Sequence, residues 1–254
     1  MIICLDLGNT NIDVGVYLET RELVCHFKLH TDLYKSESEY LNLIDSFLVY
    51  NKINKDEIKG SILSSVVPNL TKKLMWAIEK LTKTKCLLVS KNLKSGLKIQ
   101  IDNPNELGSD LLCDGVASYN NYKTNCIVVD LGTVSKILFI SKDKEYKGGV
   151  FFPGIQHQKE SLFKNAAMLY DTEFTFYDSL ICKNTSSAIS NGILYEVLYT
   201  IKGYTNQIEK QINQPITKIL TGGDSYLFKD KLEGFIYNKY LTLEGLFDLY
   251  MKNN

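Results

Sequence analysis

Apolar residues in this chain fall into short runs and helical stripes that alternate, a pattern typical of an α/β fold. The first run, Ile2–Leu5, ends at Asp6 and a polar turn, and we expect it to form a buried strand. Apolar runs at 12–18 and 23–29 follow closely enough to continue it as an antiparallel meander. The sequence Ser36-Glu37-Ser38-Glu39 has the form of a capping box, and the spacing behind it predicts a helix.

The middle of the chain continues with alternating elements. Hydrophobic spacing predicts three of them: a strand at 61–67 that ends at Pro68, a helix at 70–81, and a strand at 86–89. Residues 102–105 are dense in turn formers, so the chain is expected to bend there. From Asn105 onward apolar residues recur at helical spacing, and we expect a helix with Glu106 and Asp110 in its first turn.

The opening motif returns almost halfway along the chain. Residues 126–133 repeat the order of residues 2–10: an apolar strand, then Asp, Leu, Gly and a hydroxyl residue. The remaining expected elements are strands at 137–140, before 148–154 and at 216–220, and helices at 156–169, 186–212 and 242–251. The repeat predicts two similarly built α/β halves, 1–118 and 119–254, that face one nucleotide cleft.

The repeated turn has residues that suit a phosphate and its metal. Glycine lets the backbone approach an anion, and Asn and Thr offer hydrogen-bond donors. The carboxylates of Asp6 and Asp130, on opposed strand ends, are suited to hold a divalent ion. Thr221-Gly222-Gly223 offers a third close-approach loop for a nucleotide, although it fits an ordinary turn equally well. With neither a P-loop nor a dinucleotide fingerprint present, the set is typical of an ATP-dependent phosphotransferase of the duplicated actin/hexokinase/Hsp70-like (ribonuclease H-like) class.

Composition narrows the function classes further. The 254 residues have a formal net charge of zero, which argues against a nucleic-acid partner. The chain has no apolar run of the ~20 residues that span a bilayer and no signal-peptide pattern, so we expect a cytoplasmic protein without a membrane partner. The six cysteines lack C-x-x-C spacing and are expected to be free thiols. Arg21 is the only arginine, so other anion sites must rely on lysine.

Motifs along nearly the whole chain resemble those of the type III pantothenate kinases. Residues 6–11, DLGNTN, are similar to the first phosphate motif of that family, and 130–133 to its second. Residues 64–68 are similar to its SSVVP segment, and 102–110 to its DNP-x-ELGAD substrate segment. Further likenesses follow in the family's order, at Gly148-Gly149, Pro153-Gly154, 185–192, 221–223 and 241–246.

The resemblance implies transfer of the γ-phosphoryl group of ATP to the 4′-hydroxyl of pantothenate, the first step of coenzyme A synthesis. Asp110 corresponds to the general base. The implied ATP-binding residues are Asp6, Leu7, Gly8, Asn9, Thr10, Asn11, Ile12, Asp13, Thr133, Gly222 and Gly223. The implied pantothenate-binding residues are Ile101, Gly108, Ser109, Asp110, Leu111 and Thr185.

The resemblance also implies cations and a partner. Asp6 would meet Mg²⁺ through ATP, and Asp130 would coordinate a monovalent cation, potassium or ammonium. A homodimer is implied, with the substrate site near its interface and Thr185 reaching across. By themselves, Asp110 also fits a carboxylate favoured at a helix start, and Asn184 fits a helix cap beside Thr185.

Three departures from the family pattern fall in the site itself. Leu111 stands where the family has Arg, Ile101 where it has Tyr, and Lys136 where it has a hydroxyl residue. Three accounts are open: a pantothenate kinase with an altered substrate grip and Lys136 replacing part of the cation requirement, a kinase for a related hydroxyl compound, or a nucleotide-binding regulator. The first is favoured, because Asp6, Asp110, Asp130 and Thr133 are all retained.

Overall fold

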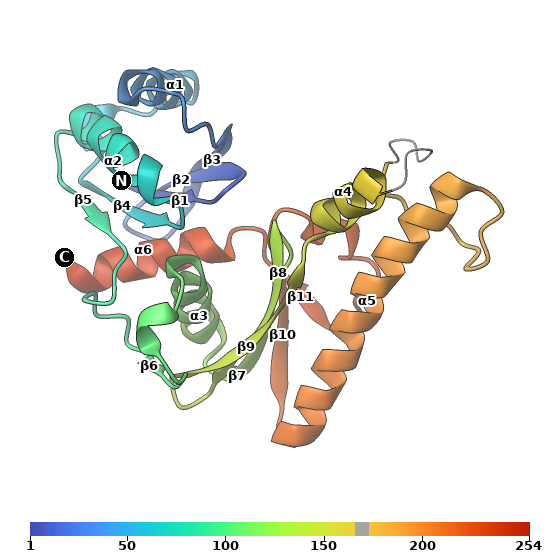
Figure 1. The fold of residues 1–254 in the computed structure, drawn as a ribbon. Helices are drawn as coiled ribbons and strands as arrows, with labels where there is room; N and C mark the ends of the chain where they lie inside the picture. Colours follow the sequence, from blue (N-terminus) through green and yellow to red (C-terminus); the bar gives the residue numbers. More distant parts are fainter. Residues whose placement is uncertain (166–172) are drawn as a thin grey trace. The chain divides into compact units, whose positions relative to one another are not determined.

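The computed structural model describes residues 1–165 and 173–254, which divide into two compact units (Figure 1). The first unit contains Met1–Leu97, Asp102–Asn120 and Leu241–Asn254, and the second contains Lys98–Ile101 and Asn121–Tyr240. The chain therefore passes between the units several times. The predicted halves 1–118 and 119–254 describe the repeat in the sequence, whereas these units describe compactness. The predicted halves therefore stay a prediction.

The first unit is built on a five-stranded sheet in the order β3-β2-β1-β4-β5. Its strands are β1 (Ile2–Leu7), β2 (Asn11–Tyr17), β3 (Leu23–His30), β4 (Gly60–Ser65) and β5 (Cys86–Leu88). The first three pair antiparallel, which confirms the predicted meander, and β4 and β5 continue the sheet parallel to β1.

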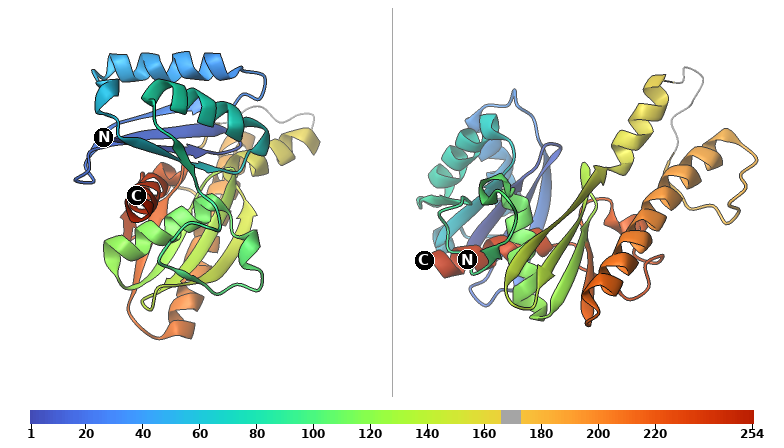
Figure 2. Two further views of the ribbon diagram at one scale, coloured as in Figure 1. Left: turned by 90° about the vertical axis from the view of Figure 1, so that its left-hand side faces the viewer. Right: turned by 60° about the horizontal axis from the view of Figure 1, so that its bottom comes forward.

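Two helices cover one face of this sheet (Figure 2). Helix α1 (Glu37–Tyr50) begins at the predicted capping box, and α2 (Pro68–Thr82) has Pro68 in its first turn, where a missing N–H costs nothing. The 3₁₀ turn η1 (Lys55–Glu57) lies between them in sequence. Alternate β1 residues Ile3, Leu5 and Leu7 pack in the core with these helices, so Asp6 belongs to the opposite face.

Helix α6 (Leu241–Asn253) packs on that opposite face of the first sheet. The rings of Tyr17 on β2 and Phe247 on α6 are 5.3 Å apart. Gly60 of β4 has no room for a side chain, because Tyr250 of α6 lies against it. The single arginine, Arg21, forms a bidentate pair with Asp248 of α6 at 2.8 and 2.9 Å.

The helix predicted from Asn105 begins later than expected. Residues Pro104–Glu106 form the 3₁₀ turn η2, and α3 spans Ser109–Tyr122. Leu107 has extended backbone angles and separates the two, which leaves Glu106 outside the first turn of α3. Asp110 does lie in that first turn, as predicted.

The second unit repeats the strand pattern of the first. Its six strands run in the order β11-β10-β7-β8-β9-β6. They are β6 (Lys98–Ile99), β7 (Asn125–Asp130), β8 (Val134–Ser141), β9 (Glu145–Pro153), β10 (Ile216–Thr221) and β11 (Phe235–Tyr237). As in the first sheet, β7-β8-β9 is an antiparallel meander, and β10 and β11 run parallel to β7. The predicted duplication is confirmed at the level of sheet topology, whereas β6 and β11 were not predicted.

Apolar residues of β7 and of α5 (Thr185–Ile212) form the core of the second unit, together with the region of the 3₁₀ turn η3 (Ser225–Leu227). Helix α4 (Ile155–Asn165) packs beside α5. The end of the helix predicted at 156–169 lies outside the described residues. Every helix in the described part of the chain is too short or too polar to span a bilayer. All six cysteines are free thiols.

Candidate active site

The first Asp-Leu-Gly turn connects β1 to β2, and Thr31, directly after β3, hydrogen-bonds to its backbone. The Gly8 N–H donates to the Asn11 carbonyl at 3.0 Å. The Thr31 hydroxyl donates to the Gly8 carbonyl at 2.7 Å, and the Thr31 N–H donates to the Thr10 carbonyl at 2.9 Å. These bonds fix the backbone of a turn whose tip, including Asn9 and Thr10, is exposed.

The predicted ATP-binding residues of this turn differ in what they present. The side chains of Leu7 and Ile12 are fully buried in the core, so only their backbone is available to a nucleotide. Asp13 lies directly opposite Asp6 across β1 and β2, and two facing carboxylates repel each other. Two β3 side chains contact Asp13: His26 Nε2 lies 2.8 Å from its Oδ1, and Lys28 Nζ lies 3.3 Å from its Oδ2, where the lysine charge offsets the repulsion. Neither contact was predicted from the sequence.

Asp110 and Asp6 come together within the first unit. Burial raises the pKa of the Cys113 thiol well above its ordinary value, and the charges of Asp6, Asp114 and Asp110 raise it further. The two carboxylates from distant parts of the sequence thus surround one buried position of α3. Gly108 has no side chain, which leaves room for the Asp110 carboxylate: a Cβ there would lie only 2.6 Å from Oδ1.

The other predicted pantothenate-binding residues have different surroundings. Leu111 is buried in the structure, with 7% of its surface exposed. The Ser109 hydroxyl bonds to the end of β4. Ile101 belongs to the second unit, where it lies beside Gly148, whose φ of +108° favours glycine.

The second turn, between β7 and β8, carries an ion pair between two directly facing residues. Lys136 lies directly opposite Asp130 in the antiparallel register, and Lys136 Nζ lies 2.7 Å from Asp130 Oδ2. Only 16% of the lysine side chain and 13% of the aspartate side chain are exposed. A charge-assisted bond this short, mostly shielded from water, is stronger than a surface ion pair.

Two other segments pack tightly against this second turn. Gly222 has a φ of +94°, and a Cβ there would collide with Asp130 and with the Leu131 backbone. Gly154, just before α4, is equally close to the backbone of Gly132 and Thr133. The Thr133 carbonyl also lies 2.8 Å from His157 Nδ1, a contact that no feature of the sequence signalled. The glycines at 154 and 222 therefore allow backbone to approach backbone.

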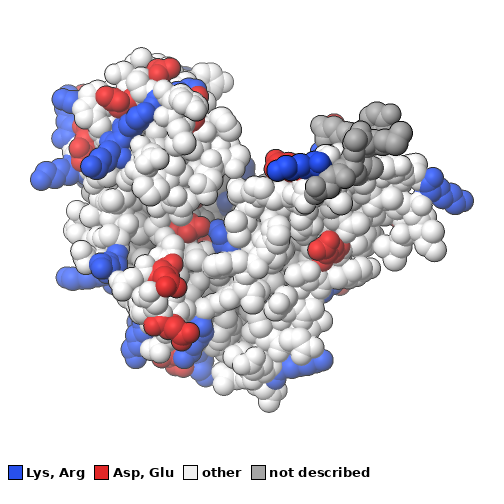
Figure 3. Space-filling model, in the orientation of Figure 1, with Lys and Arg blue, Asp and Glu red and all other residues white. Residues whose placement is uncertain are grey.

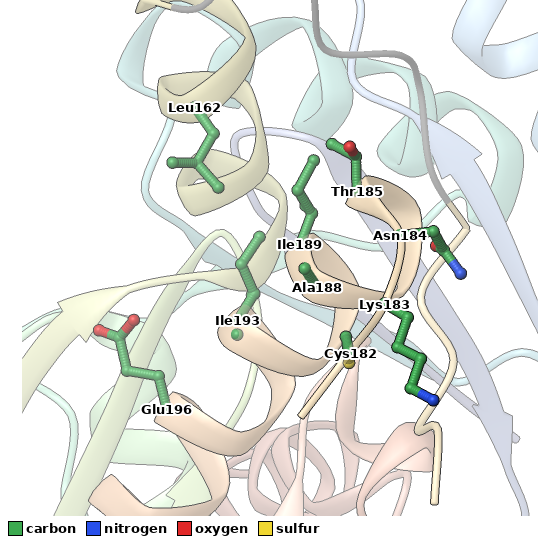
Figure 4. Close-up of a pocket in the computed structure, with 10 residues that line it drawn as sticks. Leu162, Cys182, Lys183, Asn184, Thr185, Ala188, Ile189, Ile193 and Glu196 are labelled. Atoms are coloured by element: carbon green, nitrogen blue, oxygen red, sulfur yellow. The ribbon is translucent and has the colours of Figure 1, made fainter. Parts of the chain in front are cut away.

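Thr185 lies at the start of α5, where Asn184 caps the helix by accepting a 2.9 Å bond from the Ser187 N–H. It lines a groove of about 700 Å³ between α4 and α5 (Figure 4). Leu162 and Ile189 contribute apolar side chains to the same groove. No cluster of three or more His, Cys, Asp or Glu suited to a metal occurs among residues 1–165 and 173–254.

Comparison with known proteins identifies the family. The family model described as Type III pantothenate kinase matches residues 2–207. The chain belongs to the type III pantothenate kinases. It is 39% identical to the type III pantothenate kinase of Bacillus cytotoxicus over 254 residues, which cover all of this chain and 97% of that relative.

Solved structures support the fold alone. A Baf family transcriptional activator from Campylobacter jejuni is similar with a TM-score of 0.61 and 21% identity, over 99% of this chain and 98% of that one. The ethanolamine utilization protein EutJ from Carboxydothermus hydrogenoformans matches with a TM-score of 0.54 and 13% identity, over 96% of this chain and 88% of that one.

Family membership confirms the fold and the reaction class inferred from the sequence. The chain is an ATP-dependent phosphotransferase of the family that phosphorylates pantothenate in the first step of coenzyme A biosynthesis. The roles of individual residues, the cations and the assembly are a separate question.

Proposed function

We propose that this type III pantothenate kinase uses Asp110 as its general base and Asp6 at the phosphates of Mg-ATP. The observation that carries the proposal is geometric: Ser64 pairs directly opposite Asp6 in the sheet, and its hydroxyl lies 2.9 Å from that of Ser109, the residue before Asp110. Phosphoryl transfer depends mainly on positioning and charge neutralisation, so two well-placed carboxylates suit it.

In the proposed reaction, Asp110 accepts the proton of the 4′-hydroxyl as that oxygen attacks the γ-phosphorus. The bond between the γ-phosphorus and the β,γ-bridging oxygen breaks, and ADP leaves with the electron pair. The carboxylate of Asp6 and the exposed oxygens of Asn9 and Thr10 are of the kind that Mg²⁺ prefers, so the residues fit that ion. Magnesium bound with ATP supplies neutralisation of phosphate charge.

The surroundings of Asp130 do not favour the monovalent cation that the family resemblance implies there. One oxygen of Asp130 already has the Lys136 ammonium at 2.7 Å, so the site has a cation that belongs to the chain. A second cation beside this ammonium would be repelled. We therefore propose that Lys136 supplies the charge that potassium or ammonium supplies in relatives, and that turnover does not depend on added potassium.

Rates of ADP release in potassium, ammonium and sodium test this role of Lys136. The native enzyme is expected to be equally active in all three, and Lys136→Thr is expected to be active only with potassium or ammonium. The matched control Lys142→Thr removes an exposed lysine of the same unit and should leave the cation response unchanged. A native enzyme that needs potassium would refute the proposal.

The acceptor site has lost its arginine. Leu111 is buried and apolar, and the only guanidinium of the chain is paired with Asp248. A missing charge-assisted contact to the pantothenate carboxylate costs about 1.5–3 kcal/mol, which corresponds to a roughly ten- to hundredfold weaker affinity. We propose a pantothenate kinase with a high KM for its acceptor.

A coupled ADP-release assay with pantothenate and with its neutral alcohol analogue tests the acceptor. Turnover of pantothenate that disappears in Asp110→Asn and persists in the control Asp143→Asn, an exposed acid, is the expected result. Faster turnover of the neutral analogue would instead favour a kinase for a related hydroxyl compound. Nucleotide binding by calorimetry without turnover of either acceptor would favour a regulator.

The groove between α4 and α5 supports a homodimer. Its lining includes the exposed apolar side chain of Leu162, 42% exposed, and Ile181, which precedes the lining residue Cys182 in the chain, is 84% exposed. A second copy of the chain is the occupant that the family resemblance implies, and it would bring Thr185 to a shared interface. Sedimentation should show a dimer for the native chain and a monomer for Ile181→Glu.

No nucleic-acid or membrane partner forms part of the proposal. Figure 3 shows Lys and Arg side chains interspersed with Asp and Glu on the face in view, as the zero net charge leads one to expect. Binding to DNA would require a basic surface and would weaken with salt. Gel retardation in low salt should therefore detect no complex.

A further inference from the structure

The Ser109 hydroxyl makes an unusual set of bonds for a serine at the start of a helix. It donates to the Ser65 carbonyl at 3.1 Å and accepts from the Ser65 N–H at 3.1 Å. It also accepts from the Ser64 hydroxyl at 2.9 Å. All three partners belong to the last two residues of β4, which lie 44 and 45 positions earlier in the chain.

These three bonds use the whole capacity of the side chain. A serine hydroxyl has one proton to donate and two lone pairs to accept with. The proton goes to Ser65, and the lone pairs are occupied by the Ser65 N–H and the Ser64 hydroxyl. The Ser109 hydroxyl therefore has no remaining donor or acceptor for a substrate, and only the backbone of Ser109 could bind one.

The position of these bonds connects both carboxylates of the first unit. Ser109 directly precedes Asp110 in the first turn of α3. Ser64 lies directly opposite Asp6, across the parallel pairing of β1 and β4. The Ser109 hydroxyl thus ties the turn that carries Asp110 to the strand that adjoins Asp6. Ser64 is fully buried, so its end of the connection is shielded from competing water, and Ser109 is half-buried.

Because Gly108 precedes it, the orientation of Asp110 depends on these three hydrogen bonds of Ser109. Gly108 leaves room for the carboxylate, and Leu107, with extended backbone, separates it from η2. The Leu107 N–H donates to the Pro104 carbonyl and the Gly108 carbonyl accepts from the Leu112 N–H, so both bonds stay within this segment and α3. The three bonds of the Ser109 hydroxyl are the ones that join the segment to β4. A displacement of about 1 Å at a reacting group typically costs about a hundredfold in rate.

We propose that Ser109 is a positioning residue that acts through its hydroxyl, holding Asp110 against the end of β4 at the distance from Asp6 that the reaction needs. The proposal rests on the proposed role of Asp110 as general base. It assigns Ser109 a function distinct from contact with the acceptor, and it attributes to Ser64 a smaller share of the same function.

The test compares Ser109→Ala with Ser118→Ala. Ser118 belongs to the same helix and is fully buried, and its hydroxyl donates to two carbonyls of its own turn, Asp114 at 2.7 Å and Gly115 at 3.0 Å. Ser109→Ala is expected to lower kcat about ten- to hundredfold, with KM for ATP and for pantothenate within about twofold. Ser118→Ala should keep kcat within about twofold, and thermal melting should establish that both variants are folded.

Two further variants separate positioning from stability. Ser109→Thr keeps the hydroxyl and should restore most of kcat. Ser64→Ala removes one of the three bonds and should lower kcat less than Ser109→Ala, and the double variant should be no worse than Ser109→Ala alone. Such non-additivity is expected only where both residues act through the same contact.

The outcomes distinguish this proposal from the one on which it rests. If Asp110→Asn abolishes turnover while Ser109→Ala retains native kcat, the positioning role is wrong and the general base stands. A rise in KM for pantothenate with unchanged kcat would show that Ser109 binds the acceptor instead. Equal losses in Ser109→Ala and Ser118→Ala would attribute the effect to the helix as a whole. Unchanged turnover in Asp110→Asn would overturn the base assignment itself.

Discussion

The turn between β1 and β2 and the turn between β7 and β8 begin with the same Asp-Leu-Gly sequence, but different charges face their aspartates. In the first sheet, the row across the strands reads Ser64, Asp6, Asp13 and Lys28. In the second sheet, the corresponding row reads Thr221, Asp130, Lys136 and Phe151. One backbone arrangement thus places a carboxylate beside an acid in one unit and beside an ammonium in the other.

The two turns also differ in what supports them. Thr31 braces the first through two hydrogen bonds and leaves its tip exposed. Gly154 and Gly222 bring two other backbones against the second so closely that neither has room for a Cβ. Together these differences indicate that the aspartate of the second turn is neutralised by a lysine of the chain, whereas the residue facing the aspartate of the first turn is itself an acid.

The largest effect is expected from removing the two aspartate charges separately. Asp6→Asn should lower kcat by about a thousandfold, because the charge it supplies at the phosphates has no substitute. Asp130→Asn should lower kcat by roughly tenfold or less, since Lys136 remains. ADP release measured per mole of folded protein checks both values. Equal losses would show that the two turns are not functionally distinct.

The glycines of the two turns should respond very differently to alanine. Gly222→Ala should destabilise the protein by about 3 kcal/mol, because the side chain would meet backbone atoms and the φ of +94° is unfavourable for alanine. Gly8→Ala should cost only about 1 kcal/mol, since its Cβ would lie 3.1 Å from the Asn11 carbonyl oxygen and its φ is not in the left-handed region. Urea denaturation of the two variants measures the difference.

The two hairpins themselves could be predicted from the sequence, because the signals for them are local. The buried runs before Asp6 and Asp130 and the repeated Asp-Leu-Gly predicted both hairpins and their duplication. Short edge elements were missed, since β6 at Lys98–Ile99 and β11 at Phe235–Tyr237 are too brief to show a period. The late start of α3 was missed because the extended backbone of Leu107 has no sequence signal.

The ion pair of Asp130 and Lys136 could not be derived from the motif, because it depends on register. Asp6 faces Asp13, seven positions on, whereas Asp130 faces Lys136, six positions on. The second turn is therefore one residue shorter, and aligning the two motifs residue by residue would pair the wrong side chains. The contacts of Ser109 with β4 are non-local for the same reason.

Removing the carboxylate of the ion pair should lower the stability of the fold, and removing the lysine charge as well should restore most of it. Asp130→Asn leaves a largely buried ammonium without its carboxylate and should destabilise the protein by about 2 kcal/mol. The double variant Asp130→Asn with Lys136→Met removes both charges and should recover most of that loss. Urea midpoints of the single and double variants give the coupling directly.

Asp13, which faces Asp6 in the first hairpin, provides the comparison for this coupling. Asp13 is 29% exposed, with Lys28 Nζ at 3.3 Å and His26 Nε2 at 2.8 Å, so Asp13→Asn should cost at most about 1 kcal/mol. A cost at Asp13 equal to that at Asp130 would mean that burial does not distinguish the two rows. Raising the salt concentration should weaken the Asp13 effect more than the Asp130 effect.

An effect that appears only at alkaline pH is expected from buried thiols. Burial raises the pKa of Cys86 in the first unit and of Cys126 in the second, each to about 11 from 9.0. These thiols stay protonated in the folded chain while the unfolded chain releases the protons. Their contribution to stability is therefore complete below about pH 9 and is lost as pH rises toward 11, by roughly 1.4 kcal/mol for each thiol at pH 10.

Replacing Cys86 or Cys126 should thus reduce the alkaline loss of stability by the same amount. The total loss should nevertheless differ between the two units. Cys4, Cys25 and Cys113 also have raised pKa values and belong to the first unit, which should therefore lose more stability between pH 8 and pH 10. Trp76, the single tryptophan, reports on that unit alone, and circular dichroism reports on both. In a reducing buffer, urea midpoints followed by fluorescence should fall further with pH than those followed by circular dichroism. Midpoints that fall together would mean that the two units unfold as one cooperative structure and share the cost.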